Sequence, residues 1–156
     1  MSAIESRLKT LGITLPTAPR AVANYIPYVL TGNLLVISGQ LPMVRGELAF
    51  EGKVGADLTT EEAGNAAGVC AINILAQVRS AIHDLDRVRR VVRLGGFVNC
   101  IDTYEEQPAV INRASDIMVE VFGEKGRHAR SAVGVNALPL GAPVEIDAMF
   151  EVEGGA

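Results

Sequence analysis

Tryptophan is absent from this sequence of 156 residues, which holds only three tyrosines and four phenylalanines. Proteins that bind single-stranded RNA stack bases on aromatic side chains, so such stacking surfaces are scarce here. Acidic residues outnumber basic ones by 18 to 14, which gives a net charge of −4. Because a general nucleic-acid binder needs a basic field over its footprint, the composition argues against that class and leaves only a local basic patch open.

Cysteine is as scarce as histidine, with Cys70 and Cys100 the two in the chain. Two cysteines give neither a disulfide framework nor the spacing of metal ligands, so we expect no metal site. Cys70 lies in the apolar run GVCAINIL, which favours a buried thiol. Cys100 ends a strand-like stretch, where a packed and an exposed thiol both remain open.

Long apolar runs are also missing. No stretch is long enough to span a bilayer, and the N-terminus, MSAIESRLKTLG, lacks the charged-then-apolar pattern of a signal peptide. We therefore expect a soluble, cytoplasmic protein without membrane contact. There is no internal repeat or linker, and the length suits one domain with a real core, so residues 1–156 are expected to form a single domain.

The first third of the chain predicts one short helix and several short strands. Ile4, Leu8 and Leu11 recur at helical spacing before Gly12, which predicts a helix over about residues 3–11. The segment YIPYVLTGNLLVISGQLP is typical of two strands joined at TGN. The segment RGELAFEGKVG predicts a further short strand between glycine turns.

Two long helices are the clearest elements. The first opens with Thr59 and Glu62 in a capping-box pattern, and its apolar stripe consists of Ala67, Cys70, Ala71, Ile74, Leu75, Val78, Ala81 and Ile82. The second begins near Pro108, a residue favoured in a first helical turn, and ends at Gly123. Its stripe consists of Val110, Ile111, Ala114, Ile117, Met118, Val121 and Phe122.

The remaining segments predict strands. RVRRVVRLGGFVNC lies between the two helices, and ARSAVGVNALPLGAPVEIDAMFEV contains two strands separated by a loop with prolines and glycine. In the last strand apolar residues alternate strictly with others from Val144 to Val152. The order predicts an α+β fold, a mixed sheet with the two long helices on one face. The other face must be solvated or covered by another subunit.

The stretch GRHARSAVGV places a cationic cluster at the start of a strand. Arg130 shares one strand face with Ala132 and Gly134, and these small residues leave room for a ligand. A guanidinium in that setting suits a carboxylate, which it can hold with two parallel hydrogen bonds. A solvent-facing arginine at a strand start is the alternative that the pattern leaves open.

Glu145 lies on the polar face of the last strand. If the two last strands are neighbours, its carboxylate comes near Arg130 and can orient a water or carry a proton, provided that burial shifts its pKa toward neutrality. A surface glutamate is the alternative. His128 has no nearby serine or cysteine partner in the sequence, so a histidine-activated nucleophile is not supported, and His83 suits a helix cap.

Four segments together resemble one known family. YIPYV with GNLLVISGQLP, GFVN, VINRASDIMVEVFGE and ARSAVGVNALPLGAPVEIDA are similar, in this order and spacing, to the Rid family of reactive-intermediate (enamine/imine) deaminases, also called YjgF-like. The resemblance runs from about residue 14 to 153. It implies a chorismate-mutase-like fold assembled as a homotrimer with ligand clefts between subunits. It also implies hydrolysis of 2-aminoacrylate and related 2-imino acids to 2-keto acids and ammonia, with no cofactor.

The resemblance also implies roles for six residues. The family's substrate-carboxylate arginine falls on Arg130 and its water-handling glutamate on Glu145. The four positions that contact substrate fall on Tyr28, Ser38, Gly39 and Asn112. Arg127 and His128 are expected in a loop and at the rim of the cleft.

The sequence departs from the family pattern in three places. Ala132 replaces a cysteine found in many members, Ile26 replaces a glycine, and the N-terminal helix together with the insert at 44–55 lengthens the chain. Two other functions remain as alternatives: a small-ligand-binding regulator that uses the same cleft, and an endoribonuclease or translation inhibitor. The net negative charge argues against an endoribonuclease. The presence of both Arg130 and Glu145 favours catalysis over ligand binding alone, since a carboxylate binder needs only the arginine.

Overall fold

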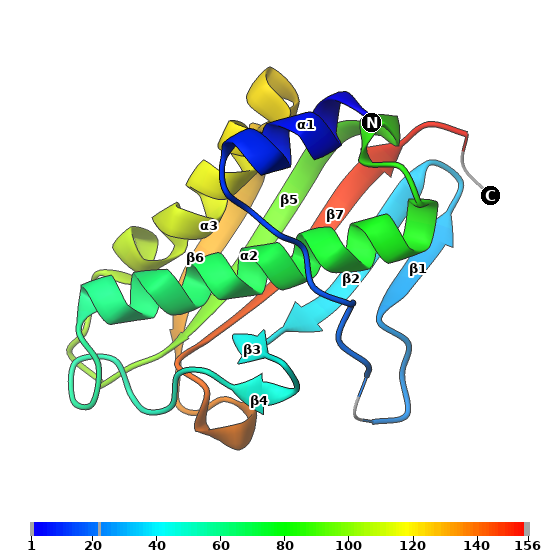
Figure 1. Ribbon diagram of the computed structural model, residues 1–156. Coiled ribbons are helices and arrows are strands. Elements are labelled where there is room, and N and C mark those ends of the chain that lie inside the picture. Colours follow the sequence, from blue (N-terminus) through cyan, green and yellow to red (C-terminus); the bar gives the residue numbers. More distant parts are fainter. Residues whose placement is uncertain (1, 22, 155–156) are drawn as a thin grey trace.

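Strand β7 (Val144–Val152) runs through the middle of a five-stranded mixed sheet with the order β1-β2-β7-β5-β6 (Figure 1). The computed structural model describes residues 2–21 and 23–154. Helices α2 and α3 cover one face of the sheet, and no helix of the described residues covers the other, which we call the open face (Figure 1). The predicted α+β class, with a mixed sheet and two long helices on one face, is confirmed.

The other elements follow the predicted order along the chain. Their bounds are α1 (Ala3–Thr10), β1 (Tyr28–Thr31), β2 (Leu34–Gln40), β3 (Met43–Val44), β4 (Glu47–Leu48), α2 (Thr60–Ile82), η1 (Leu85–Arg87), β5 (Val88–Asn99), α3 (Gln107–Phe122), η2 (Gly123–Gly126), β6 (Ala129–Val135) and η3 (Pro139–Gly141). None of the helices in the described part of the chain has the length and apolar character needed to cross a bilayer.

Helix α2 begins with the predicted capping box. Thr59 Oγ1 accepts from the backbone N–H of Glu62, and Glu62 Oε1 accepts from the backbone N–H of Thr59, each at 3.1 Å. The helix ends at His83, which adopts the left-handed conformation with φ 66°. The predicted apolar stripe is buried throughout except for half-buried Ala81, and the α3 stripe is buried in full. Both helices thus pack the faces that their periodicity predicts.

Strand β7 buries alternate side chains against the helices and turns the others to the open face. Val144, Ile146 and Ala148 are buried, whereas Glu145 and Asp147 are half-buried on the opposite face. The register extends this division across the sheet, because Leu94 lies opposite Ala148 and Phe97 opposite Glu145. Burial of Cys100 resolves the alternative that the sequence left open.

The two last strands are not neighbours. β6 pairs in parallel with β5, and β7 is inserted between β5 and β2, where it pairs antiparallel to both. The loop between β6 and β7 therefore passes the C-terminal end of β5 instead of forming a hairpin, because Val135 pairs with Asn99 and Val144 with Val98. The 44–55 insert contains the last residue of β3 and all of β4, and these two strands pair in a small separate ladder.

Candidate functional site

Glu145 lies against a strand residue that has no side chain. A bulge in the pairing of β2 with β7 falls between Ile37 and Gln40 and contains Ser38 and Gly39. A Cβ added to Gly39 would lie 2.5 Å from Glu145 Oε2, so the carboxylate occupies the space that a side chain would fill. Only glycine at position 39 leaves room for this placement of Glu145.

Ser38 fixes the chain that passes beside this bulge. Its hydroxyl donates to the carbonyl of Ile26 at 2.8 Å, and its backbone N–H donates to the carbonyl of Pro27 at 2.9 Å. Three of the predicted residues thus lie together, because Ser38 directly precedes Gly39 and Glu145 lies against Gly39. We call Ser38, Gly39 and Glu145 the carboxylate half-site.

The pKa of Glu145 is raised from its ordinary value, first by partial burial and second by the neighbouring negative charge of Asp147. The pKa of Asp147 is itself raised by burial, and Arg93 at 3.8 Å together with a backbone hydrogen bond from Gly95 opposes that rise. A carboxyl with a raised pKa takes up a proton more readily at neutral pH than an exposed one. Glu145 therefore has the electrostatic setting of a proton carrier.

Arg130 lies on edge strand β6 and reaches toward α3. Its Nη1 donates to Ser115 Oγ at 3.1 Å, and its Nη2 donates to the carbonyl of Pro108 at 3.3 Å. Asn112 stands four residues after Pro108 and three before Ser115, which places it on the same side of the helix, and it is exposed. We call Asn112, Ser115 and Arg130 the arginine half-site.

His128 has a serine partner that the sequence did not reveal. Its Nε2 lies 2.9 Å from Ser115 Oγ, and its Nδ1 lies 2.6 Å from the carbonyl of Gly126. A carbonyl only accepts, so Nδ1 donates to it, and in the neutral ring Nε2 accepts from the Ser115 hydroxyl while that oxygen accepts from Arg130. His128 thus orients Arg130 through Ser115, whereas exposed Arg127 pairs with Glu124 in the loop as expected.

His128 follows Ser115 by thirteen positions and lies just before β6 instead of on α3, so no local motif links them. The one available signal is the polar edge of α3, where Ser115 follows Asn112 by a helical turn.

The two half-sites do not meet within one chain. Arg130 lies opposite Leu94, and Leu94 opposite Ala148, so the arginine stands on the helix-covered side of the sheet. Glu145 lies on the open face, with β5 between its strand and β6. The condition for a direct pairing of Arg130 with Glu145, neighbouring strands, is not met. Alternation shows which residues share a face within a strand, but it does not fix the order of strands.

Tyr28 belongs to neither half-site in the single chain. It pairs with Ile37 on the side of the sheet that faces the helices, and it packs half-buried against the core. Its strand β1 is one edge of the sheet and β6 is the other, so Tyr28 and Arg130 are separated by the full width of the sheet (Figure 1).

Comparison with known proteins identifies the family. The family model described as "YjgF/chorismate_mutase-like, putative endoribonuclease" matches residues 5–150. The chain belongs to the YjgF/Rid family. "Protein TCP17" of Trypanosoma cruzi is 47% identical over 150 residues, which are 96% of this chain and 94% of that protein.

Two further members of the YjgF/Rid family are informative. A crystal structure of a protein of unknown function from Agrobacterium tumefaciens has a TM-score of 0.90 at 52% identity and covers 96% of this chain and 92% of its own. A protein of Dermatophagoides farinae named 2-iminobutanoate/2-iminopropanoate deaminase is 30% identical, over 90% of this chain and 95% of its own. Family and fold are thereby shown, whereas the specific reaction of this member is a matter for proposal.

Neither cysteine occupies the position at which many members of the Rid family carry one. That position is Ala132 on β6. Cys100 is buried near this strand, since a Cβ added to Gly134 would lie 2.9 Å from Cys100 Sγ. Cys70 is buried as predicted, and burial raises the pKa of its thiol well above the ordinary value, which keeps it protonated and unreactive. The described residues contain no group of three metal-ligating side chains.

Proposed function

We propose that this protein hydrolyses reactive enamine and imine intermediates, 2-aminoacrylate and related 2-imino acids, to 2-keto acids and ammonia. The observation that carries the proposal is the placement of Glu145, which is half-buried over side-chain-free Gly39 with a raised pKa. Family membership and the relative named 2-iminobutanoate/2-iminopropanoate deaminase support the same reaction class. The chemistry needs only water and an acid–base group, so no cofactor is invoked.

We further propose that the active cleft forms between copies in a homotrimer. Each chain carries a carboxylate half-site on the open face and an arginine half-site at the β6 edge, and the two do not face each other. A second copy that lays its β6 edge against the open face supplies the missing half. Exposed apolar residues on that face, Val29 on β1 and Val133 on β6, favour coverage by another chain. Asn112 then lines the cleft from the copy that supplies Arg130, whereas a contact of Tyr28 with the substrate stays a prediction from the family resemblance.

In the proposed mechanism Arg130 holds the substrate carboxylate. Its contacts to Ser115 and Pro108 use two of its five N–H groups and leave three for the substrate. A water held by Glu145 attacks the C=N carbon, and Glu145 accepts its proton as the C–O bond forms. Glu145 passes this proton to the nitrogen, which gives the neutral carbinolamine. It then accepts the proton of the new hydroxyl and delivers it to the amine as the C=O bond forms and the C–N bond breaks, so that keto acid and ammonia leave.

Positioning supplies most of the rate, because the imine carbon is already electrophilic. Loss of the two-point grip of Arg130 on the carboxylate should cost a few kcal/mol, on the order of a hundredfold in rate. Ser38 and Gly39 would offer backbone groups to the substrate at the same place, and Gly39 leaves room for the carboxylate of Glu145.

The proposal is tested by coupling an amino-acid oxidase, which makes 2-imino acids in situ, to this protein over a panel of amino acids. We expect faster release of keto acid, with activity reduced at least a hundredfold in Arg130→Ala and in Glu145→Gln. Matched controls are Arg127→Ala, from the same cationic cluster, and Glu151→Gln, from the same face of β7, and both should retain full activity. Absence of acceleration by the native protein, or full activity in either site variant, would refute the assignment. Ligand binding without turnover would instead indicate a regulator.

A further inference from the structure

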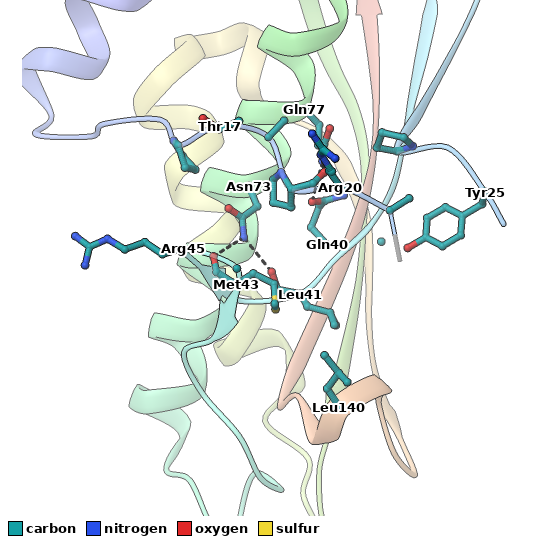
Figure 2. Close-up of a pocket in the computed structure, with 17 residues that line it drawn as sticks. Thr17, Arg20, Tyr25, Gln40, Leu41, Met43, Arg45, Asn73, Gln77 and Leu140 are labelled. Atoms are coloured by element: carbon teal, nitrogen blue, oxygen red, sulfur yellow. Dashed lines mark hydrogen bonds between the residues drawn. The ribbon is translucent and has the colours of Figure 1, made fainter. Parts of the chain in front are cut away.

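A second cavity lies on the helix side of the sheet, under the N-terminal segment that joins α1 to β1. Its volume is about 630 Å³, and it is bounded by residues 16–21, by the end of β2 and by α2 (Figure 2). Neither Arg130 nor Glu145 lines it, and of the predicted site residues only Gly39 does. The cavity therefore adjoins the carboxylate half-site at Gly39 but includes neither Glu145 nor any residue of the arginine half-site.

Three amide side chains give the cavity a polar floor. Gln40, Asn73 and Gln77 are buried, and the two on α2 are only 1% exposed. Asn73 Nδ2 donates to the carbonyls of Leu41 and Met43 at 3.0 Å each (Figure 2).

The same floor fixes the N-terminal segment above it. Gln77 Nε2 donates to the carbonyl of Pro19 at 2.6 Å. The Oε1 of Gln77 is buried without a hydrogen-bond partner among residues 2–21 and 23–154. These bonds hold both walls in place, so the cavity is formed in advance of any ligand.

The charge of the cavity has one sign. Arg20 and Arg45 are the charged residues among the described lining, and neither forms an ion pair within the part of the chain that the structure describes. Figure 2 shows Arg20 on the side of Gln77 and Gln40, whereas Arg45 extends away from Asn73. In a protein with net charge −4, this local positive charge favours an anion at Arg20.

Apart from Thr17 and Tyr25, the rest of the lining is apolar or glycine. Leu41, Met43 and Leu140 lie below Asn73 in the view of Figure 2, and three prolines, Pro16, Pro19 and Pro27, also line the cavity. An apolar enclosure with one cation at its mouth and neutral amides below fits an organic anion better than an inorganic one, because the ligand body replaces water on the apolar walls.

We propose that this cavity binds a small monocarboxylate with an apolar or aromatic body, its carboxylate at Arg20 and its body against Leu41 and Met43. The site is independent of the proposed imine chemistry. It depends on the N-terminal segment, which Gln77 holds over the cavity. A second ligand site beside Gly39 gives the protein a place for a carboxylate metabolite that is not its substrate.

The test uses the fluorescence of 2-naphthylacetate titrated with the full-length protein, whose lack of tryptophan leaves little background. We expect saturable binding that weakens about fivefold in Arg20→Ala, as for a single charge-assisted contact, and at least tenfold in Ala18→Phe, which adds a ring to the cavity wall. The neutral analogue 2-naphthylacetamide should bind more weakly than the carboxylate.

Two variants locate the bound probe. Arg90→Ala removes an exposed arginine of β5 and should leave the affinity unchanged, and Arg130→Ala should do the same because it belongs to the arginine half-site. Lack of saturable binding to the native protein, or unchanged affinity in both Arg20→Ala and Ala18→Phe with folding verified by circular dichroism, overturns the proposal. Loss of binding in Arg130→Ala with retention in Arg20→Ala also overturns it, since the probe then occupies the proposed substrate cleft.

Discussion

Mixing two inactive variants should restore activity if the half-sites of different copies complete each other. Arg130→Ala removes the arginine half-site and Glu145→Gln disables the carboxylate half-site, and the two residues stand on opposite sides of the sheet in one chain. In a mixed assembly, an interface that takes its arginine from the Glu145→Gln chain and its glutamate from the Arg130→Ala chain contains an intact site. A site formed within one chain could not be rebuilt in this way.

The size of the recovery follows from counting interfaces. In an assembly drawn at random from equal amounts of both chains, each interface is intact with a chance of about one quarter, whatever the number of subunits in the ring. The coupled oxidase assay on co-expressed chains should therefore show about a quarter of native activity, against about a hundredth for each variant alone. A mixture of Arg130→Ala with the double variant contains no intact interface and serves as the control. Activity of the test mixture no higher than this control would refute the inter-copy cleft.

Three further predictions concern single residues of the two half-sites. Because folding raises the pKa of Glu145, its contribution to the free energy of unfolding should fall as pH rises above about 4.3, the glutamate pKa in an unfolded chain. The melting temperature of Glu145→Gln should therefore exceed that of the native protein at pH 7 and match it near pH 3.5. Ser115→Ala removes the hydroxyl that orients Arg130 and should raise KM about fivefold with little change in kcat, and Ser115→Thr should return KM to its native value. A native KM in the alanine variant would show that His128 does not orient Arg130 through Ser115. Gly39→Ala places a Cβ 2.5 Å from the Glu145 carboxylate and should lower kcat/KM at least tenfold. The control Gly64→Ala, where nothing outside its own helix lies closer than 4.0 Å, should keep full activity and raise the free energy of unfolding in urea titrations by about 0.5–1 kcal/mol. Equal activity of the two alanine variants would show that the site does not need Gly39.

Local patterns were enough to predict the elements. The capping box at Thr59 and Glu62 set the start of α2, and the strict alternation from Val144 to Val152 set both the strand and its buried face. These signals work because each depends on residues within one helical turn or one strand. The turn signal at TGN likewise predicted the pairing of β1 with β2, in which Thr31 pairs with Leu34 and a two-residue loop of Gly32 and Asn33 joins the strands.

The order of strands was beyond such patterns. A loop with prolines and glycine between β6 and β7 is compatible with a hairpin and with a connection past the end of a third strand, and only the pairing of the whole sheet distinguishes the two. The same limit applies to His128, whose serine partner comes from another element. The large cavity was also missed, because its floor is built by Asn73 and Gln77, which interrupt an otherwise apolar helix surface and carry no motif.

The last strand in chain order is also the middle strand of the sheet, and this has a consequence for biosynthesis. Until Val144–Val152 has left the ribosome, β2 and β5 have no common neighbour, and the apolar faces that they share with the helices stay open to solvent. Leu34 must then find Glu151 across most of the length of the chain. Folding is thus expected to be a late, concerted event that follows translation, with a slow rate set by these distant pairings. Nascent chains that stop before Val144 should be the species most in need of chaperones.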